Sequence, residues 1–217
     1  MRSFRVDIDN PLPEAVEVAA DAVVNGEIIC YPTDTVYGLG GNALSEEVCR
    51  RINRVKGRRE DNPLIILIDI RNIRDWISGK DYSRLKPFIE RIWPRPVTMI
   101  VDPPSVKIPK MLIGPTGGVA IRAVSVELDI QIMKKAGVPL ASTSANKTEE
   151  PINQVLDSSD DWLCSFCSVL LDAGKIDIAT PSTLVDVRGF PEKLIIKRGS
   201  AVPFGDFMKA FPDTRIE

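Results

Sequence analysis

Histidine is missing from all 217 residues of the sequence. It is the commonest general base near neutral pH and the commonest metal ligand in proteins. Its absence excludes the Ser-His-Asp and Cys-His mechanisms of nucleophilic catalysis.

Cysteine is also scarce, with four residues in the chain: Cys30, Cys49, Cys164 and Cys167. Only the last two have CxxC spacing, and no second pair accompanies them. A lone CxxC is weak evidence for zinc. We expect no protein metal site, and buried thiols are the favoured interpretation of Cys164 and Cys167 over a metal or redox role.

The sequence lacks a long uncharged apolar run and an N-terminal signal-like segment. This pattern predicts a cytoplasmic protein with no membrane contact. Basic and acidic residues nearly cancel, at 28 and 30, and aromatic residues make up 6%. Nothing in this balance attracts nucleic acid globally, so any RNA contact would need a local patch.

Strand-like and helix-like segments alternate along the chain. This order predicts an α/β (α+β) fold in which helices flank a twisted mixed sheet of about seven strands. We expect a single domain over 1–217, with a core of about 10–200 and a short closing helix after Phe204. The expected helices cover 13–25, 45–56, 73–76 and 85–93, and the strand-like segments cover 27–31, 64–68, 97–101, 119–122, 138–142, 168–172, 182–187 and 193–197.

The stretch 31–41 reads YPTDTVYGLGG and follows an apolar segment. Pro32 cannot donate to a sheet, so we expect a strand to end there and a polar glycine loop to follow. Glycine permits a positive φ or a close backbone approach. A strand, a glycine loop and a helix in this order indicate an anion site, with an ordinary connector loop as the alternative.

Hydroxyl and cationic side chains recur at the ends of the expected strands. The hydroxyls are at Thr33, Thr35, Ser142, Thr143, Ser144, Ser182 and Thr183, and the cations at Lys56, Arg58, Arg59, Arg122, Lys197 and Arg198. Strand ends are where pockets form in sheet folds. Such a site favours a polyanion and suits phosphoryl or nucleotidyl transfer, which needs charge neutralisation more than a titrating base.

Each cation taken alone has an ordinary alternative, a solvated surface charge. Arg122 lies within an apolar segment, where a charge is costly unless it meets an anion. The P-loop GxxxxGK[ST] and the Rossmann GxGxxG motifs are both missing, so a nucleotide site here needs another design.

Seven ordered motifs resemble the YrdC-like family of threonylcarbamoyl-AMP synthases, in its short single-domain form. They span roughly 10–200 and comprise Tyr31–Gly40, Lys56-Gly57-Arg58 with Asn62-Pro63-Leu64, Trp93-Pro94 with Pro96, Val119–Arg122, Ser144-Ala145-Asn146, Ser182-Thr183 and Lys197-Arg198-Gly199. The resemblance implies a twisted mixed sheet around a large, positively lined cavity.

It also implies a nucleotidyltransferase that joins L-threonine, bicarbonate or CO2, and ATP with the help of Mg2+. The implied products are L-threonylcarbamoyl-AMP and pyrophosphate. A separate transferase complex would use the first product for t6A modification of tRNAs that read ANN codons, and weak tRNA contact is a further expectation.

The resemblance assigns roles residue by residue. Lys56, Arg58 and Asn146 would be catalytic. L-threonine would contact Thr35, Arg122, Ser142 and Ser182, and ATP would contact Arg58, Asn62, Ser144, Lys197 and Arg198.

The sequence departs from the pattern of many relatives in four places. Thr143 replaces a proline, Pro151-Ile152-Asn153 replaces Ser-Pro-Thr, Leu67 stands where longer relatives have histidine, and Arg95 replaces a glycine. The chain ends near the end of the synthase domain, so we expect it to lack the extra C-terminal domain of longer relatives.

Two other functions compete with this one. The same fold would serve as a double-stranded RNA or tRNA-binding module without synthase activity, which the balanced charge disfavours. The related domain of hydrogenase-maturation proteins acts on carbamoyl phosphate, but its acylphosphatase and zinc-finger modules have no counterpart in this sequence.

Overall fold

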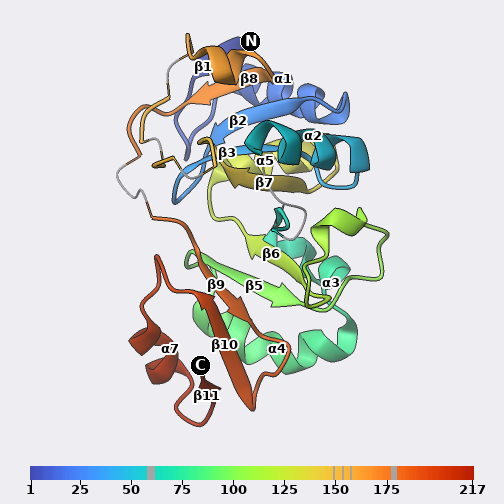
Figure 1. Cartoon of the computed structure of the whole chain (residues 1–217), viewed down its shortest axis with the longest axis vertical. Helices are drawn as coiled ribbons and strands as arrows, with labels where there is room; N and C mark the ends of the chain where they lie inside the picture. The colour runs from blue at the N-terminus through green and yellow to red at the C-terminus, as the bar shows by residue number, and fades with distance from the viewer. Residues whose placement is uncertain (58–61, 149, 153, 157, 177–179) are drawn as a thin grey trace.

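The fold is a single mixed sheet flanked by helices (Figure 1). The computed structural model describes residues 1–57, 62–148, 150–152, 154–156, 158–176 and 180–217. Within these residues the sheet has eleven strands in the order β1-β8-β2-β3-β7-β4-β6-β5-β9-β10-β11. Parallel and antiparallel neighbours alternate irregularly, which confirms the predicted mixed α/β class with a larger strand number than expected.

The bounds of the strands agree with most of the expected segments. They are β1 Arg2–Arg5, β2 Ile28–Pro32, β3 Tyr37–Asn42, β4 Ile65–Ile68, β5 Val97–Val101, β6 Val119–Ala123, β7 Leu140–Ser144, β8 Cys167–Asp172, β9 Thr183–Asp186, β10 Lys193–Arg198 and β11 Arg215–Ile216. The α-helices are α1 Pro13–Val24, α2 Glu46–Lys56, α3 Ile73–Trp76, α4 Gly79–Ile92, α5 Glu127–Ala136, α6 Asp161–Cys164 and α7 Phe204–Ala210. The expected closing helix is α7.

The strand ends at Pro32 as predicted, but the predicted glycine loop is wrong over 37–41, because these residues belong to strand β3. A turn over 33–36 connects β2 to β3, and the two strands pair antiparallel with Tyr31 opposite Gly38. Gly38, Gly40 and Gly41 have no positive φ in this strand. A Cβ on Gly40 would lie 2.7 Å from the Ala141 carbonyl oxygen and 2.8 Å from the Tyr31 hydroxyl. Close packing of neighbouring strands therefore requires the glycine. Of the two roles expected for these glycines, the close backbone approach is confirmed at Gly40, and the positive φ is wrong.

Two apolar clusters cover opposite faces of the sheet. Along β2, Ile28 and Cys30 pack into one cluster while Ile29 and Tyr31 pack into the other. This alternation follows from the two-residue period of a strand. The second cluster also contains apolar residues of α1 and α5, so we call its side the α1/α5 face.

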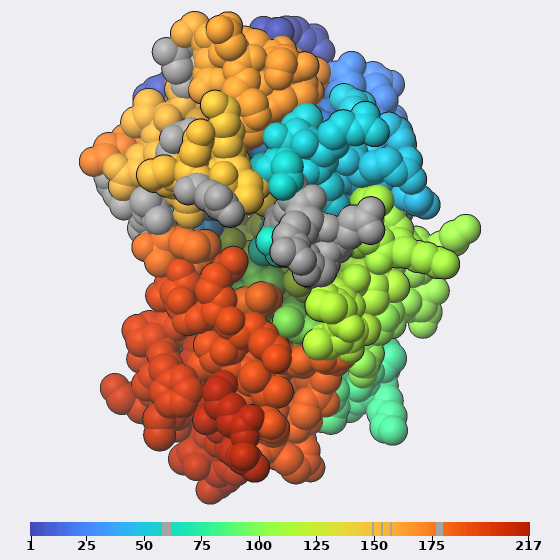
Figure 2. Space-filling model, in the orientation of Figure 1, coloured from blue at the N-terminus to red at the C-terminus, as the bar shows by residue number. Residues whose placement is uncertain are grey.

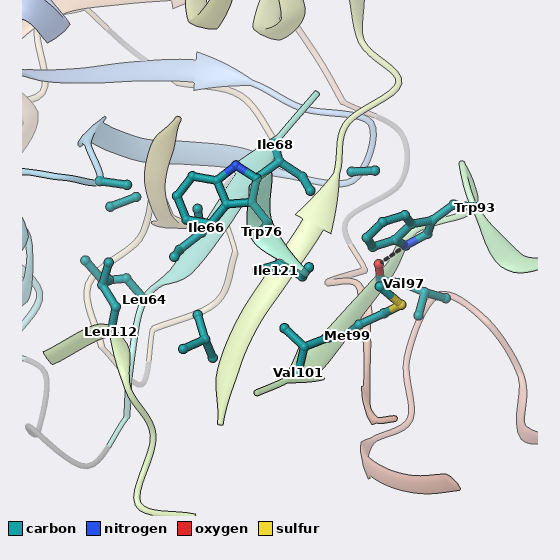
Figure 3. Packing of buried hydrophobic residues seen from close by; sticks show 14 of the residues in the cluster. Leu64, Ile66, Ile68, Trp76, Trp93, Val97, Met99, Val101, Leu112 and Ile121 are labelled. Atoms are coloured by element: carbon teal, nitrogen blue, oxygen red, sulfur yellow. Dashed lines mark hydrogen bonds between the residues drawn. The ribbon is translucent and has the colours of Figure 1, made fainter. Parts of the chain in front are cut away.

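The larger cluster lies on the other face and extends through α2 and α4. Figure 3 shows Ile66 and Ile68 of β4, Ile121 of β6 and Met99 of β5 packed side by side. The indole Nε1 of Trp93 donates to the Val97 carbonyl oxygen at 2.7 Å, also drawn there. This hydrogen bond removes the cost of burying the indole N–H without a partner.

Helix α2 begins and ends at residues that suit its termini. The Ser45 side chain accepts a hydrogen bond from the Val48 N–H, and Gly57 adopts a left-handed conformation with φ 60°. A serine N-cap and a left-handed glycine satisfy backbone groups that a helix end leaves free. The helix therefore stops directly after Lys56, at a fixed point beside strand β7.

The two chain ends lie at opposite ends of the molecule (Figure 1). In Figure 2 the C-terminal segments, in orange to red, fill the lower part of the visible face. No helix among the described residues has the length and apolar character that a membrane span requires.

Candidate functional site

A cavity of about 100 Å³ opens on the α1/α5 face where the ends of β2, β3, β4, β6 and β7 meet the approach to β9. Leu67 belongs to the cluster on this face, and its register partner across β4 and β6 is Arg122. The described lining residues are Thr33, Thr35, Val36, Gly38, Ile65, Leu67, Arg122, Ser142, Thr143, Ser144, Pro181, Ser182 and Arg198.

Arg122 carries the central charge of this cavity and is 5% exposed. Its Nη1 donates to the Thr35 hydroxyl at 3.0 Å, and its Nη2 donates to the Asp34 carboxylate. Both partners lie in the turn between β2 and β3. The cost of burying the guanidinium is thus offset by an ion pair and a hydroxyl contact.

The turn itself is held by the Thr33 hydroxyl. This group donates to the Val36 carbonyl oxygen at 2.7 Å and accepts from the Thr35 and Val36 N–H groups. A threonine that closes a turn on its own backbone fixes the following residues. Asp34 and Thr35 are therefore presented to Arg122 in a defined orientation.

Ser142 of β7 is oriented by Tyr31 of β2, across the intervening strand β3. The Tyr31 hydroxyl donates to Ser142 Oγ at 2.8 Å, and both groups are buried. Burial raises the pKa of Tyr31 far above its ordinary value, and Asp129 adds to this effect. The phenol is therefore a fixed donor, and Gly38 and Gly40 leave the room that its ring occupies.

The opposite wall comes from the segment before β9 and from β10. Ser182 Oγ lies 2.7 Å from the Thr98 hydroxyl, and the Ser182 carbonyl oxygen accepts from Arg198 Nη2 at 2.8 Å. Burial of the guanidinium and the nearby charge of Arg122 lower the pKa of Arg198. The cavity is therefore lined by two cations, of which Arg122 is paired with Asp34.

Lys56 is buried, but it does not line the cavity among the described residues. Its Nζ donates to the Ser144 carbonyl oxygen at 2.9 Å, to the Asn146 carbonyl oxygen and to Asn146 Oδ1 at 3.1 Å. Ser144 Oγ donates to the same Oδ1 at 2.6 Å. Lys56 thus connects the end of α2 to the end of β7.

The structure brings together six of the predicted site residues as cavity lining: Thr35, Arg122, Ser142, Ser144, Ser182 and Arg198. Lys56 and Asn146 are buried immediately beside Ser144, while Asn62 and Lys197 are exposed outside the described lining. Arg58 lies outside the described residues, as does Asn153 of the departure at 151–153. The threonine set is therefore gathered in one place, and the ATP set is only partly gathered.

Sequence reasoning missed the supporting residues Tyr31, Asp34 and Thr98. Asp34 had a usable signal, because it adjoins Thr35 in the same turn and Arg122 needs a counter-charge. Tyr31 and Thr98 read as ordinary strand residues, and only the sheet order shows which hydroxyls they meet.

The buried-thiol interpretation holds for Cys167 and is wrong for Cys164, which is exposed. Burial raises the pKa of the Cys167 thiol to about 12. Cys164 is the last residue of the single-turn helix α6, whereas Cys167 is the first residue of strand β8 in the sheet. Within the described ranges no three metal-ligating side chains come together.

A wider hollow of about 740 Å³ lies elsewhere, between α3, α5 and the start of β7. Asp69, Arg71, Asp75 and Lys134 stand on its rim together with Trp76. None of the predicted site residues lines it. The smaller cavity around Arg122 is therefore the better candidate site, because hydroxyls and cations converge there.

Comparison with known protein families gives a match over most of the chain. The family model for Sua5, YciO and YrdC proteins, described as telomere recombination, matches residues 21–199. A threonylcarbamoyl-AMP synthase of Pyrococcus abyssi (strain GE5 / Orsay) is 29% identical over 201 residues, which cover 93% of this chain and 58% of the relative. One from Bacillus subtilis (strain 168) is 31% identical over 186 residues, covering 83% and 53%.

A solved structure agrees with these sequence matches. Pyrococcus abyssi Sua5 complexed with L-threonine superimposes with a TM-score of 0.84 at 26% identity, over 100% of this chain and 63% of that one. The chain thus spans little more than half the length of the two curated relatives.

Proposed function

This chain belongs to the Sua5/YciO/YrdC family, and on that premise we propose that it is a threonylcarbamoyl-AMP synthase. The proposed reaction joins L-threonine, bicarbonate or CO2, and ATP, and yields L-threonylcarbamoyl-AMP and pyrophosphate. One observation carries the proposal: Thr35, Arg122, Ser142 and Ser182, which are far apart in sequence, line the same small cavity.

The chemistry of this cavity suits a small hydroxylated amino acid. A guanidinium binds a carboxylate through two parallel N–H donors. Ser142 and Ser182 offer buried hydroxyls on two different walls, and Leu67 offers an apolar surface between them. Sites that hydrogen-bond a substrate hydroxyl reject analogues lacking it, because their own polar groups would stay unpaired.

We propose that the phosphates of ATP lie between Ser144 and Arg198 in the same cavity, with Arg58, Asn62 and Lys197 adding contacts. Lys56 would act with Asn146 through the Ser144 segment that both hold. Mg2+ would arrive bound to the phosphates, as it commonly does in nucleotide sites. It would supply charge neutralisation at the triphosphate.

In the proposed mechanism the threonine amine first takes up CO2, forming a carbamate and releasing a proton. A carbamate oxygen then attacks the α-phosphorus of ATP, and the bond to the leaving pyrophosphate breaks. The chain's residues position the carboxylate at Arg122 and neutralise the phosphates, which is where catalysis of nucleotidyl transfer chiefly rests.

The proposal extends to the use of the product. L-threonylcarbamoyl-AMP would pass to a separate transferase complex for t6A modification of tRNA in the cytoplasm. The RNA-binding alternative has no support in the site, because its polar groups face a small buried cavity and not an extended surface. Affinity for tRNA should then be weak and should fall steeply as salt is added. Affinity for ATP should fall less steeply.

Product identification tests the proposal. We would incubate the purified chain with ATP, bicarbonate and either L-threonine, L-serine or L-valine, and identify adenylated products by mass spectrometry. Threonylcarbamoyl-AMP should form, with much less of the serine and valine analogues. A product profile without any carbamoyl-adenylate would contradict the proposed function.

A further inference from the structure

Asp129 is a buried carboxylate that the proposed mechanism does not use. It is the third residue of α5, is 0% exposed and has no hydrogen-bond partner for either oxygen among the described residues. An unpaired carboxylate in an apolar interior costs several kcal/mol. A helix terminus alone does not explain such burial, since an acidic residue in a first turn normally faces solvent.

Arg122 has an unpaired donor on the same side of the sheet. Its neighbours Ile121 and Ala123 pack on the opposite face, so Arg122 points to the α1/α5 face. Its Nη1 and Nη2 donate to the turn over 33–36, whereas its Nε is buried without a partner among the described residues. A buried donor and a buried acceptor are thus both unpaired.

The two groups lie within electrostatic reach of each other. Burial raises the pKa of the Asp129 carboxyl well above its ordinary value; the charge of Asp34 raises it further, and that of Arg122 lowers it. The charge of Asp129 also raises the pKa of Tyr31, whose hydroxyl donates to Ser142. The charge of the Asp129 carboxyl therefore reaches Arg122 and Asp34, which line or flank the cavity, and Tyr31, which holds Ser142 in it.

We propose that Asp129 is a positioning residue for Arg122, the buried partner that accepts its Nε–H when a substrate carboxylate displaces Asp34. In the free protein Asp34 holds the cavity-facing side of the guanidinium. An incoming carboxylate needs those same donors, so the ion pair with Asp34 must break. Asp129 then keeps the side chain in place from behind, by direct contact or through one water.

This inference rests on the proposed function, because the displaced ion pair concerns the carboxylate of the amino acid substrate. It predicts an unusual pattern for Asp129→Leu. The free protein gains nothing from the unpaired carboxylate, so the midpoint of thermal unfolding should stay the same or rise. Binding of L-threonine should weaken at least tenfold, because the bound state loses the Nε acceptor.

The experiment measures L-threonine binding by calorimetry, KM for L-threonine, KM for ATP and the unfolding midpoint. Asp129→Leu should raise KM for L-threonine and leave KM for ATP unchanged, and Asp129→Asn, which keeps one acceptor oxygen, should restore part of the affinity. Glu127→Gln is the matched control, since Glu127 is exposed in the same turn and contacts Gln131. It should behave as wild type.

The outcomes separate the two proposals. Wild-type affinity for L-threonine in Asp129→Leu overturns the role of Asp129 and leaves the synthase proposal standing. A lowered unfolding midpoint in Asp129→Leu assigns the residue to the fold and also overturns its positioning role. A wild-type protein that binds no L-threonine overturns both.

Discussion

Arg122 combines a full charge with a position inside the sheet, and its five N–H donors have a fixed fork geometry. Replacing it by lysine keeps the charge and removes the fork. Charge-assisted hydrogen bonds contribute about 1.5–3 kcal/mol, so Arg122→Lys should raise KM for L-threonine by roughly 10- to 100-fold. Steady-state kinetics at saturating ATP measure this change.

Arg71→Lys serves as the control for that substitution. Arg71 is exposed and pairs with Asp69 on the surface, away from the cavity. Its replacement should leave both KM values unchanged. An Arg122→Lys enzyme that keeps the wild-type KM for L-threonine would contradict the assignment of Arg122.

Lys56 Nζ donates to three oxygens of the 144–146 segment, which are the Ser144 and Asn146 carbonyl oxygens and Asn146 Oδ1. Lys56→Met would take this donor from the Ser144 and Asn146 carbonyl oxygens, while Asn146 Oδ1 would keep its hydrogen bond from Ser144 Oγ. Each buried unsatisfied group costs about 1–3 kcal/mol. We expect a free energy of unfolding lower by about that amount or more, measured by urea denaturation, together with a loss of activity.

Lys147→Met is the comparison for Lys56. Lys147 is exposed on the same segment and lies 3.8 Å from Glu150. Surface substitutions of this kind change stability by less than about 0.5 kcal/mol. Equal stability of the two variants would show that the Lys56 contacts do not hold the segment.

The role of a single residue was predictable from the sequence where a charged side chain falls in an apolar segment, because burying it without a partner costs free energy. Arg122 in an apolar strand signals an anion, and the structure shows Asp34 in that role. Asp129 gave no such signal, because an acidic residue at the start of a helix is ordinary. Only its burial, which depends on how α5 packs on the sheet, sets it apart.

At the scale of elements, the hairpin of β2 and β3 forms one wall of the cavity. It depends on the lack of a side chain at Gly40, where a Cβ would meet the Ala141 carbonyl oxygen and the Tyr31 hydroxyl. Gly40→Ala should cost about 1–3 kcal/mol by overpacking. It should also weaken L-threonine binding, since Tyr31 orients Ser142.

Gly205→Ala is the matched control for this change. Gly205 lies in α7, and a Cβ there would have no neighbour within 4 Å. Alanine in a helix is favoured over glycine by up to about 1 kcal/mol. Thermal unfolding of both variants should show opposite shifts, and a neutral Gly40→Ala would contradict the close packing of β3.

Helices and strands were predictable from the sequence where their apolar periodicity is strong, and they were missed where it is weak. Helices α1 and α2 and strands β5 and β8 follow their apolar patterns closely. Strand β3 was missed because its sequence, YGLGGN, has the composition of a turn. Its strand character comes from pairing with β2 and β7 on both sides, which is a tertiary effect that local propensity does not contain.

At the scale of the whole molecule, stability should depend on pH through Asp129. Burial raises the pKa of this carboxyl in the folded chain. The folded state therefore binds the proton more tightly than the unfolded chain does. The resulting stability is complete below the ordinary pKa of an aspartate, about 3.9, and is lost as pH rises toward and through the folded value.

Asp129→Asn should remove this dependence. Its free energy of unfolding should exceed that of the wild type at neutral pH, and the difference should shrink as pH falls toward 4. Urea denaturation of both proteins across this pH range measures it. Parallel pH profiles for the two proteins would contradict the buried, unpaired state of Asp129.

The order of the strands could not be derived from the sequence, and it is what assembles the site. β2, β3, β7, β4 and β6 are consecutive neighbours in the sheet although they span residues 28–144. Their ends carry Thr35, Arg122 and Ser142 to one cavity. Sequence reasoning identified the residues and expected one concave site, but it could not say which strands are adjacent.

The central claim is that the cavity around Arg122 accepts L-threonine for adenylation. The most direct measurement is pyrophosphate release from ATP and bicarbonate as L-threonine is varied, for the wild type and for Arg122→Ala. The account predicts saturable, threonine-dependent release by the wild type and loss of that saturation in Arg122→Ala. Equal release without L-threonine, or an Arg122→Ala enzyme with wild-type saturation, would contradict it.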